Sequence, residues 1–345
     1  MDPERERLRQ AAQARVAMRC DIDLHADGKD CGYVRLPHSV HRSAYGWIPI
    51  PIVRIANGAG PRVLLVAGNH GDEWEGQIAL GTLIRSIEPQ EINGQLVILP
   101  SANFLAARAG RRTAPEDGGN LNRSFPGDPT GTLTQQIAYW IEHVLLPGFD
   151  YSFDFHSGGS SLYYLPSTIA YRDAEAQRMA RVLGLVRAFA APVGFMVSAP
   201  QSGGRSFTAA SIRQGVWSIA TEIGGAGLVT PQSMASMEGG VLRLLQHVGL
   251  WRGTAPPAQH DTRLTEVAGD AHYVYAMDHG LFEPLVDVGA EVQTGQAAAR
   301  IHFHATPWRE PVLLHFRHAG LVLCKRVPAL CEPGDCLFQL ASDLP

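Results

Sequence analysis

The sequence predicts an α/β domain followed by a smaller all-β domain. From about residue 53 to residue 250, short β-branched runs alternate with longer helical patterns. A stretch rich in Pro and Gly, RGTAPPAQH, follows Trp251, and beyond it short strands between glycines replace the helical pattern. An alternation of this kind predicts a sheet covered by helices on both faces. With 45% hydrophobic residues among 345, the chain can bury a large core and a second, smaller one.

Four strands and four helices are predicted within the α/β domain. The strands are expected at residues 63–67, 96–99, 151–155 and 216–221, and the helices at residues 77–87, 133–146, 174–190 and 234–250. Ligands of open α/β sheets bind beyond the carboxyl ends of the strands. Polar residues at those positions are therefore the first candidates for a functional site.

The C-terminal segment contains an approximate internal repeat. GLFEPLVDVGAEVQTGQ begins at Gly280, and GLVLCKRVPALCEPGDC begins at Gly320. Two similar β-units of this length predict a small β-barrel or β-sandwich.

Charge and hydropathy exclude several classes of partner. The chain has 29 basic and 33 acidic residues and a net charge of -4, which gives no long-range attraction for nucleic acid or anionic lipid. Its apolar runs are far shorter than the roughly 20 residues that span a bilayer. The N-terminus lacks the apolar stretch of a secretory signal, and the five cysteines form no C-x-x-C pair. We expect a cytoplasmic protein that acts on a small molecule, with a homo-oligomer left open.

A His-x-x-Glu motif follows the first predicted strand. In GNHGDEWEG, His70 and Glu73 are three residues apart across a strand-to-helix turn, so an imidazole and a carboxylate can converge on one ion. Two His and one Glu are the ligands of open catalytic zinc sites, which leave a fourth position for water. His156, at the end of the strand in YSFDFHSGG, is the predicted third ligand. The sequence thus predicts one Zn²⁺ ion per chain.

Glu222 closes the last predicted strand, in WSIATEIGG. Hydrolysis of an amide needs a group that carries a proton to the leaving nitrogen, and a carboxylate can do so. A buried carboxylate without a partner is costly, so Glu222 is either ion-paired or a catalytic base. The sequence leaves these two interpretations open.

A loop rich in turn residues, AGRRTAPEDGGNLNRSFPG at 109–127, supplies the remaining candidates. Guanidinium groups bind carboxylates in a bidentate fork and can stabilise an oxyanion. A solvated basic loop is the alternative, but Glu116 and Asp117 nearly balance its charge. The candidates are Arg111, Arg112, Asn122 and Arg123.

In this order, the motifs resemble the succinylglutamate desuccinylase and aspartoacylase branch of the zinc carboxypeptidase superfamily. The resemblance covers roughly residues 50 to 340 and implies a zinc-carboxypeptidase-like mixed sheet flanked by helices. It divides the chain into an N-terminal extension with leading strands (1–50), a zinc hydrolase catalytic domain (51–252) and a C-terminal β-domain (253–345). Within the branch, the motifs are most similar to the N-alpha-acetyl-L-2,4-diaminobutyrate deacetylases of ectoine breakdown.

The resemblance also implies a role for each candidate residue. His70, Glu73 and His156 would bind zinc, and Glu222 would act as the general base and then the general acid. Arg112 would polarise the scissile carbonyl, while Asn122 and Arg123 would hold the substrate carboxylate. Arg111 stays a substrate-binding candidate, because spacing does not decide which of two adjacent arginines faces the metal. Four further candidates are anchored by no motif: Arg205, Arg213, Tyr273 and Tyr275.

The implied function is zinc-dependent hydrolysis of the amide bond of a small N-acyl amino acid, with N-acetyl-diaminobutyrate as the expected substrate. An aspartoacylase-like or succinylglutamate desuccinylase-like deacylase is one alternative, and a metallocarboxypeptidase is another. A third alternative is a non-enzymatic protein stabilised by zinc. It predicts a closed site with four ligands, yet no fourth Cys or His occurs in a comparable position.

Overall fold

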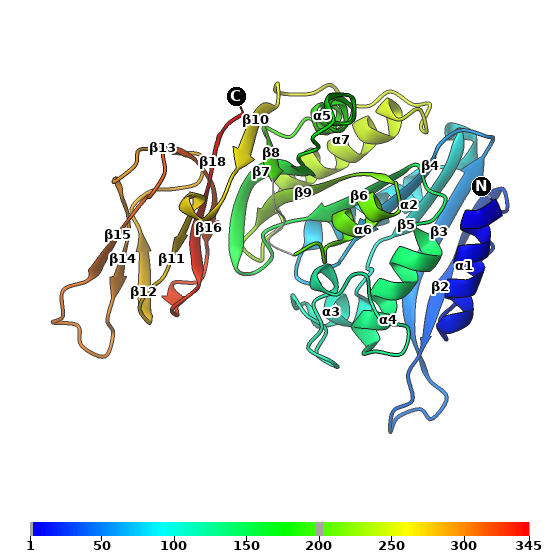
Figure 1. Ribbon diagram of the computed structural model, residues 1–345, viewed down its shortest axis with the longest axis horizontal. Helices are drawn as coiled ribbons and strands as arrows, with labels where there is room; N and C mark the ends of the chain where they lie inside the picture. Colours follow the sequence, from blue (N-terminus) through cyan, green and yellow to red (C-terminus); the bar gives the residue numbers. More distant parts are fainter. Residues whose placement is uncertain (1–2, 198–202, 345) are drawn as a thin grey trace.

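The computed structural model describes residues 3–197 and 203–344, which form an α/β body with a β-rich C-terminal part at its side (Figure 1). The central sheet is mixed, helices flank it, and a small antiparallel sheet lies apart in the C-terminal part. The predicted fold class is therefore confirmed. In the part of the chain that the structure describes, no helix is long and apolar enough to cross a membrane.

The helices are α1 (Pro3–Arg15), α2 (Trp74–Ser86), α3 (Phe104–Ala109), α4 (Leu133–Trp140), α5 (Ala176–Phe189), α6 (Phe207–Arg213) and α7 (Pro231–His247). Short helical turns are η1 (Pro89–Glu91), η2 (Leu121–Arg123), η3 (Ile141–Leu145) and η4 (Asp270–His272). The strands of the first part are β1 (Arg19–Cys20), β2 (Gly28–Pro37), β3 (Trp47–Asn57), β4 (Arg62–Ala67), β5 (Gly94–Leu99), β6 (Tyr151–His156), β7 (Leu162–Tyr171), β8 (Val193–Val197) and β9 (Trp217–Gly225). The strands that follow are β10 (Arg263–Val267), β11 (Tyr273–Tyr275), β12 (Gly280–Pro284), β13 (Glu291–Val292), β14 (Ala297–His302), β15 (Val312–His315), β16 (Gly320–Arg326), β17 (Leu330–Cys331) and β18 (Cys336–Asp343).

All four predicted helices and all four predicted strands are present, as α2, α4 continued by η3, α5 and α7 and as β4, β5, β6 and β9. The expectation that Glu222 ends its strand was wrong, because β9 continues to Gly225. The neighbouring β7 pairs antiparallel with β9 and supplies hydrogen-bond partners as far as Gly225. Glu222 therefore lies on a paired, rigid part of the sheet.

Two cores lie on opposite faces of the central sheet, and alternate residues of β4 point into each. Leu64 and Val66 pack with α1, α3, α4 and α6, whereas Val63 and Leu65 pack with α2, α5 and α7. Successive side chains of a strand point to opposite faces, so an unbroken apolar strand serves both layers. The parallel strands β4, β5, β6 and β9 form the centre of this sheet.

The C-terminal part is joined to the central sheet by strand pairing. β7, β8, β10, β18 and β16 follow one another as neighbours, and the pairing of β16 with β7 closes them into a ring of five strands. β7 and β8 precede the Pro- and Gly-rich linker, and the other three follow it. The division into residues 1–50, 51–252 and 253–345 stays a prediction.

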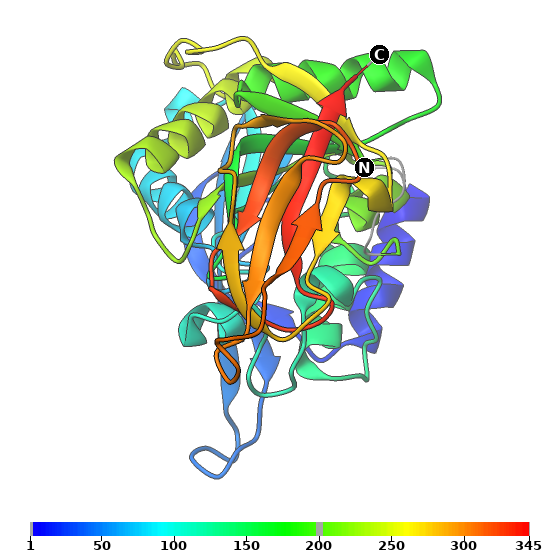
Figure 2. The same cartoon turned by 90° about the vertical axis from the view of Figure 1, so that its left-hand side faces the viewer.

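In the internal repeat, each of the two units supplies a short strand that pairs with a strand of the other unit. β17 of the second unit pairs with β12 of the first, and β13 of the first unit pairs with β16 of the second. β12 also belongs to the small sheet β15-β14-β12-β17, which faces the viewer together with β16 and β18 in Figure 2. Each unit therefore completes the other.

Asp117 fixes the loop of residues 109–127 to the start of α4. Its carboxylate accepts hydrogen bonds from the Thr134 backbone N–H (2.7 Å), the Thr134 hydroxyl (2.9 Å) and the Gly119 N–H (2.9 Å). Burial opposes ionisation of Asp117, but these hydrogen bonds outweigh it and lower the pKa of the carboxyl below its ordinary value. The loop that carries the candidate arginines is therefore held by a charged anchor.

Asp117→Asn is expected to lower the free energy of unfolding by about 1 kcal/mol at neutral pH, because three hydrogen-bond donors lose a negatively charged acceptor. The pKa of Asp117 is lowered in the folded state, so its stabilisation is present above the unfolded-state pKa of about 3.9. It is lost as the pH falls through the folded-state value. Urea unfolding of both proteins at pH 7 and in the acid range measures this, and equal stability at pH 7 would contradict it.

Candidate metal centre and active-site cavity

A tight turn between β4 and α2 positions His70 and Glu73. Gly71 lies against α3, and a Cβ at this position would come within 2.0 Å of the Ala106 backbone. The chain can therefore make this approach only without a side chain. Glu73 is the residue that precedes the first turn of α2.

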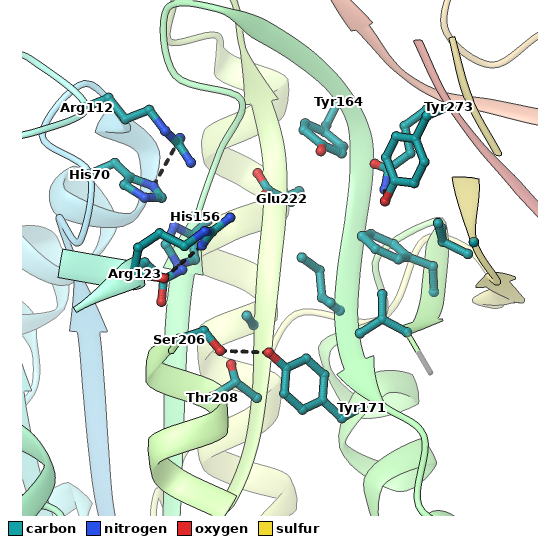
Figure 3. Close-up of a pocket in the computed structure, with 18 of the residues that line it drawn as sticks. His70, Arg112, Arg123, His156, Tyr164, Tyr171, Ser206, Thr208, Glu222 and Tyr273 are labelled. Carbon is teal, nitrogen blue, oxygen red and sulfur yellow. Dashed lines mark hydrogen bonds between the residues drawn. The ribbon is translucent and has the colours of Figure 1, made fainter. Parts of the chain in front are cut away.

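His70, Glu73 and His156 form a buried cluster of metal-ligand type. The Nδ1 atom of His70 lies 2.6 Å from Oε1 of Glu73, and Nδ1 of His156 lies 2.6 Å from Oε2 of the same carboxylate. One ligand atom from each residue lies within 4.8 Å of the others. Neighbouring parallel strands β4 and β6 carry the two imidazoles to the same edge of the sheet (Figure 3). The three predicted metal ligands are therefore brought together at one point.

The outer nitrogens of both imidazoles face oxygen atoms. His70 Nε2 lies 3.1 Å from Oδ1 of Asn120, and His156 Nε2 lies 2.7 Å from Oδ2 of Asp154. In the neutral tautomer that a metal ligand requires, each Nε2 would carry the hydrogen and each Nδ1 would direct its lone pair toward Glu73. Two imidazole nitrogens and a carboxylate oriented in this way fit a divalent metal ion.

The electrostatics of the cluster also suit a cation. Burial disfavours the charge on Glu73, but the two imidazoles outweigh it and lower the pKa of the carboxyl below its ordinary value. Burial lowers the pKa of His70. It acts in the same direction on His156, but Asp154 and Glu73 outweigh it and raise that pKa. Positive charge is therefore stabilised between the carboxylate and the imidazoles.

Asp154→Asn is expected to weaken metal binding about 10- to 100-fold, because the His156 ring loses its carboxylate partner. Asp154 also accepts a hydrogen bond from Asn69 Nδ2 at 2.7 Å, so both its partners belong to this centre. Competition with a chelator of known affinity measures the change. Asp150→Asn, at the exposed residue that precedes the same strand, is the matched control. Unchanged affinity in the Asp154 variant would show that the carboxylate does not tune His156.

Glu222 lies beside the cluster, on β9 next to β6, with His156 directly across in the strand register. Burial raises the pKa of the Glu222 carboxyl well above its ordinary value, and the negative charge of Glu73 adds to this. Its side chain points into the same cavity as the imidazoles (Figure 3). Among the described residues, Glu222 forms no salt bridge, which argues against the ion-pair interpretation.

The structure separates the two adjacent arginines. Arg112 enters the cavity, where its Nη1 lies 3.3 Å from His70 Nδ1 and 3.4 Å from Glu73 Oε1. Arg111 is exposed and lies outside that cavity, and its backbone oxygen accepts a hydrogen bond from the Gly71 N–H at 2.8 Å. This backbone bond joins the loop to the metal-binding turn. Arg112 is therefore the arginine that the structure places beside the metal ligands.

Asn122 and Arg123 also line the cavity. Oδ1 of Asn122 accepts a hydrogen bond from the Phe207 N–H at 2.8 Å, and its amide nitrogen lies 3.2 Å from His156 Nε2. Asn122 thus lies between the metal centre and the start of α6. Burial lowers the pKa of Arg123, and the nearby positive charge of Arg112 adds to this.

The cavity has a volume of about 330 Å³, and more than half of its lining residues belong to no motif that the sequence marks. Tyr164 and Tyr171 come from β7, and the Tyr171 hydroxyl lies 2.7 Å from Oγ of Ser206 (Figure 3). Tyr273, one of the unanchored candidates, lines the cavity, and Tyr275 lines a second hollow that adjoins it. Arg213, another unanchored candidate, is instead paired with Glu142.

Comparison with known proteins agrees with this site. Residues 59–248 match the model of the succinylglutamate desuccinylase/aspartoacylase catalytic domain. The chain is 37% identical over 320 residues to the N-alpha-acetyl-L-2,4-diaminobutyric acid deacetylase of Halomonas elongata, covering 93% of each protein. Two similar solved structures each cover 95% of this chain and 99% of their own. One is the succinylglutamate desuccinylase/aspartoacylase of Rhodobacter sphaeroides (TM-score 0.90, 38% identity), and the other is the product-bound ectoine utilization protein EutE (DoeB) of Ruegeria pomeroyi (TM-score 0.91, 36% identity). This chain therefore belongs to the succinylglutamate desuccinylase/aspartoacylase family and is a deacylase-type hydrolase with a His-Glu-His metal site.

Proposed function

We propose that this enzyme uses zinc to hydrolyse the amide bond of Nα-acetyl-L-2,4-diaminobutyrate, a step of ectoine catabolism. The observation that carries the proposal is the convergence of His70, Glu73 and His156 with Glu222 and Arg112 in one cavity. The 37% identity to the Halomonas elongata deacetylase over 93% of the chain supports the choice of substrate.

The residues around the metal ligands would each perform one part of the reaction. Glu222 accepts a proton from the attacking water and then donates it to the departing amine nitrogen, a role that a carboxyl of raised pKa suits. Arg112 donates hydrogen bonds to the carbonyl oxygen as negative charge develops there. Arg123, with Asn122 beside it, binds the α-carboxylate and so fixes the position of the scissile bond.

His70, Glu73 and His156 would hold the zinc ion. When bound, zinc polarises the scissile carbonyl and lowers the pKa of water near it. The family and the ligand set support zinc, because two imidazoles and a carboxylate are its usual ligands in open catalytic sites.

A substrate panel on zinc-loaded enzyme tests the proposal. We expect kcat/KM for Nα-acetyl-L-2,4-diaminobutyrate to exceed that for N-acetyl-L-aspartate, N-succinyl-L-glutamate and a set of short peptides with free C-termini by at least about tenfold. A substrate that leaves one buried charge of the site unpaired loses this much binding free energy or more. Preference for either of the first two competitors would assign a different acyl amino acid. Preference for the peptides would make the enzyme a carboxypeptidase.

A further inference from the structure

The active-site cavity has a charged end and an apolar end. Arg112 and Arg123 lie with the two imidazoles at the charged end, and Glu222 lies between the two ends (Figure 3). The apolar end is lined by Ile169 of β7, by Phe195 and Val197 of β8 and by Val267 of β10, and the Tyr171 hydroxyl lies in the same cavity, 2.7 Å from Ser206 Oγ. A substrate whose carboxylate and amide occupy the charged end therefore has an apolar surface beyond them.

The apolar wall is continuous, because β9, β7, β8 and β10 are consecutive neighbours in the sheet. Ala220 of β9 lies opposite Ile169 of β7, and Ile169 lies opposite Phe195 of β8. Two residues further along β8, Val197 lies opposite Val267 of β10. These five side chains form no hydrogen bonds but can pack against methylene groups.

The wall ends at a carboxylate. Asp270 follows β10, is exposed and lines the same cavity. Among the described residues that line this cavity, Glu222 is the other carboxylate, and it lies beside the metal ligands. In the sheet, β9, β7 and β8 separate β10 from β6, the strand that carries His156, so Asp270 is the acidic group on the side of the cavity away from the metal centre.

The C-terminal part holds the short turn that carries Asp270. Arg317 Nη2 donates a 2.6 Å hydrogen bond to the Asp270 backbone oxygen. His272, in the same turn, lies 3.0 Å from the Ser342 hydroxyl and stacks on His318 with ring centroids 4.3 Å apart. These contacts fix the turn. Within residues 3–197 and 203–344, no basic side chain forms a salt bridge with the Asp270 carboxylate, so its negative charge can bind a ligand.

The amino-acid half of the substrate is the part that can reach Asp270. Its α-carboxylate and its side chain leave the same carbon atom, so a carboxylate bound by Arg123 places the side chain in the cavity that Arg123 lines. The side chain would then pack against part of the apolar wall. A positive charge at its end would meet Asp270.

We propose that Asp270 binds a positively charged group on the substrate side chain and makes the enzyme selective for N-acyl amino acids with a short cationic side chain. This inference rests on the proposed deacylase function. It assigns selectivity to the turn between β10 and β11 rather than to the arginine-bearing loop.

Two substrates of the same shape test this. Nα-acetyl-L-norvaline replaces the ammonium group of Nα-acetyl-L-2,4-diaminobutyrate with a methyl group. The wild type is expected to prefer the cationic substrate about 10- to 100-fold in kcat/KM, the range for a hydrogen bond between charged groups. In Asp270→Asn this preference should fall below about threefold through a higher KM, with kcat/KM for the norvaline substrate unchanged within about twofold. Asp270→Lys should shift the preference toward Nα-acetyl-L-glutamate.

Asp261→Asn is the matched control, because Asp261 is exposed and lies outside the cavity. The inference is overturned if the wild type does not prefer the cationic substrate, or if Asp270→Asn lowers both activities equally or neither. Failure of the proposed function looks different, because the wild type would then cleave succinylated or peptide substrates but neither acetylated one. In that case the cationic and neutral members of the accepted series are compared, and the Asp270 inference stands or falls on their ratio.

Discussion

Glu222→Gln is expected to lower kcat by about 1000-fold while one metal ion stays bound per chain. The amide cannot accept the proton of the attacking water or return it to the leaving nitrogen, and losing a general base costs about 10² to 10⁴ in rate. The metal should remain, because the predicted ligands are His70, Glu73 and His156. Steady-state kinetics with the acetylated substrate, together with metal analysis after dialysis, measure both effects.

Glu266→Gln is the matched control for this variant. Glu266 is half-buried on β10 and paired with Arg172, and it lies outside the active-site cavity. Its replacement should leave kcat within about twofold of the wild type, as is usual for changes away from a site. Normal turnover by Glu222→Gln would refute its role as the base. Loss of the metal in the same variant would instead assign it a structural role.

His156→Ala is expected to abolish stoichiometric metal binding and, with it, turnover. The substitution removes one of three ligands and leaves Asp154 buried without its imidazole partner. In the wild type, zinc at 100 times its dissociation constant should stabilise the fold by about 2.7 kcal/mol, because it binds only the folded chain. The variant should show no such stabilisation in thermal unfolding with and without zinc.

His143→Ala controls for the loss of an imidazole. The His143 ring packs against Tyr139 at a tilt, with ring centroids 4.6 Å apart, and does not line the active-site cavity. This variant should keep one metal ion per chain and the zinc-dependent stabilisation. If His156→Ala also kept one ion, the three-residue metal site would be incorrect.

The sequence by itself determined the parts of this protein that depend on local pattern. An apolar run such as that of β4, followed by a glycine turn and an amphipathic helix, specifies a strand, a turn and a helix within about 25 residues. His70 and His156 could be predicted as ligands because each follows such a strand, and parallel strands end at one edge of the sheet. Glu222 was recognised for the same reason, although its strand continues to Gly225.

Only the tertiary structure decided which groups surround that centre. Arg111 and Arg112 are equivalent in sequence, and the bond between the Gly71 N–H and the Arg111 backbone oxygen leaves the Arg112 side chain beside His70. Asp154 carries no signal in the sequence, because an acid on a buried strand has meaning only when its partner imidazole is known.

The residues of the far wall of the cavity could not be predicted from sequence patterns either. Ile169, Phe195, Val267 and Asp270 come from separate segments, and pairing between distant strands brings them together. Strand order is set by the packing of the whole sheet and by the ring that β16 closes onto β7, not by any local run of residues. The metal centre could thus be predicted from local motifs, whereas the groups proposed to select the substrate depend on contacts between remote parts of the chain.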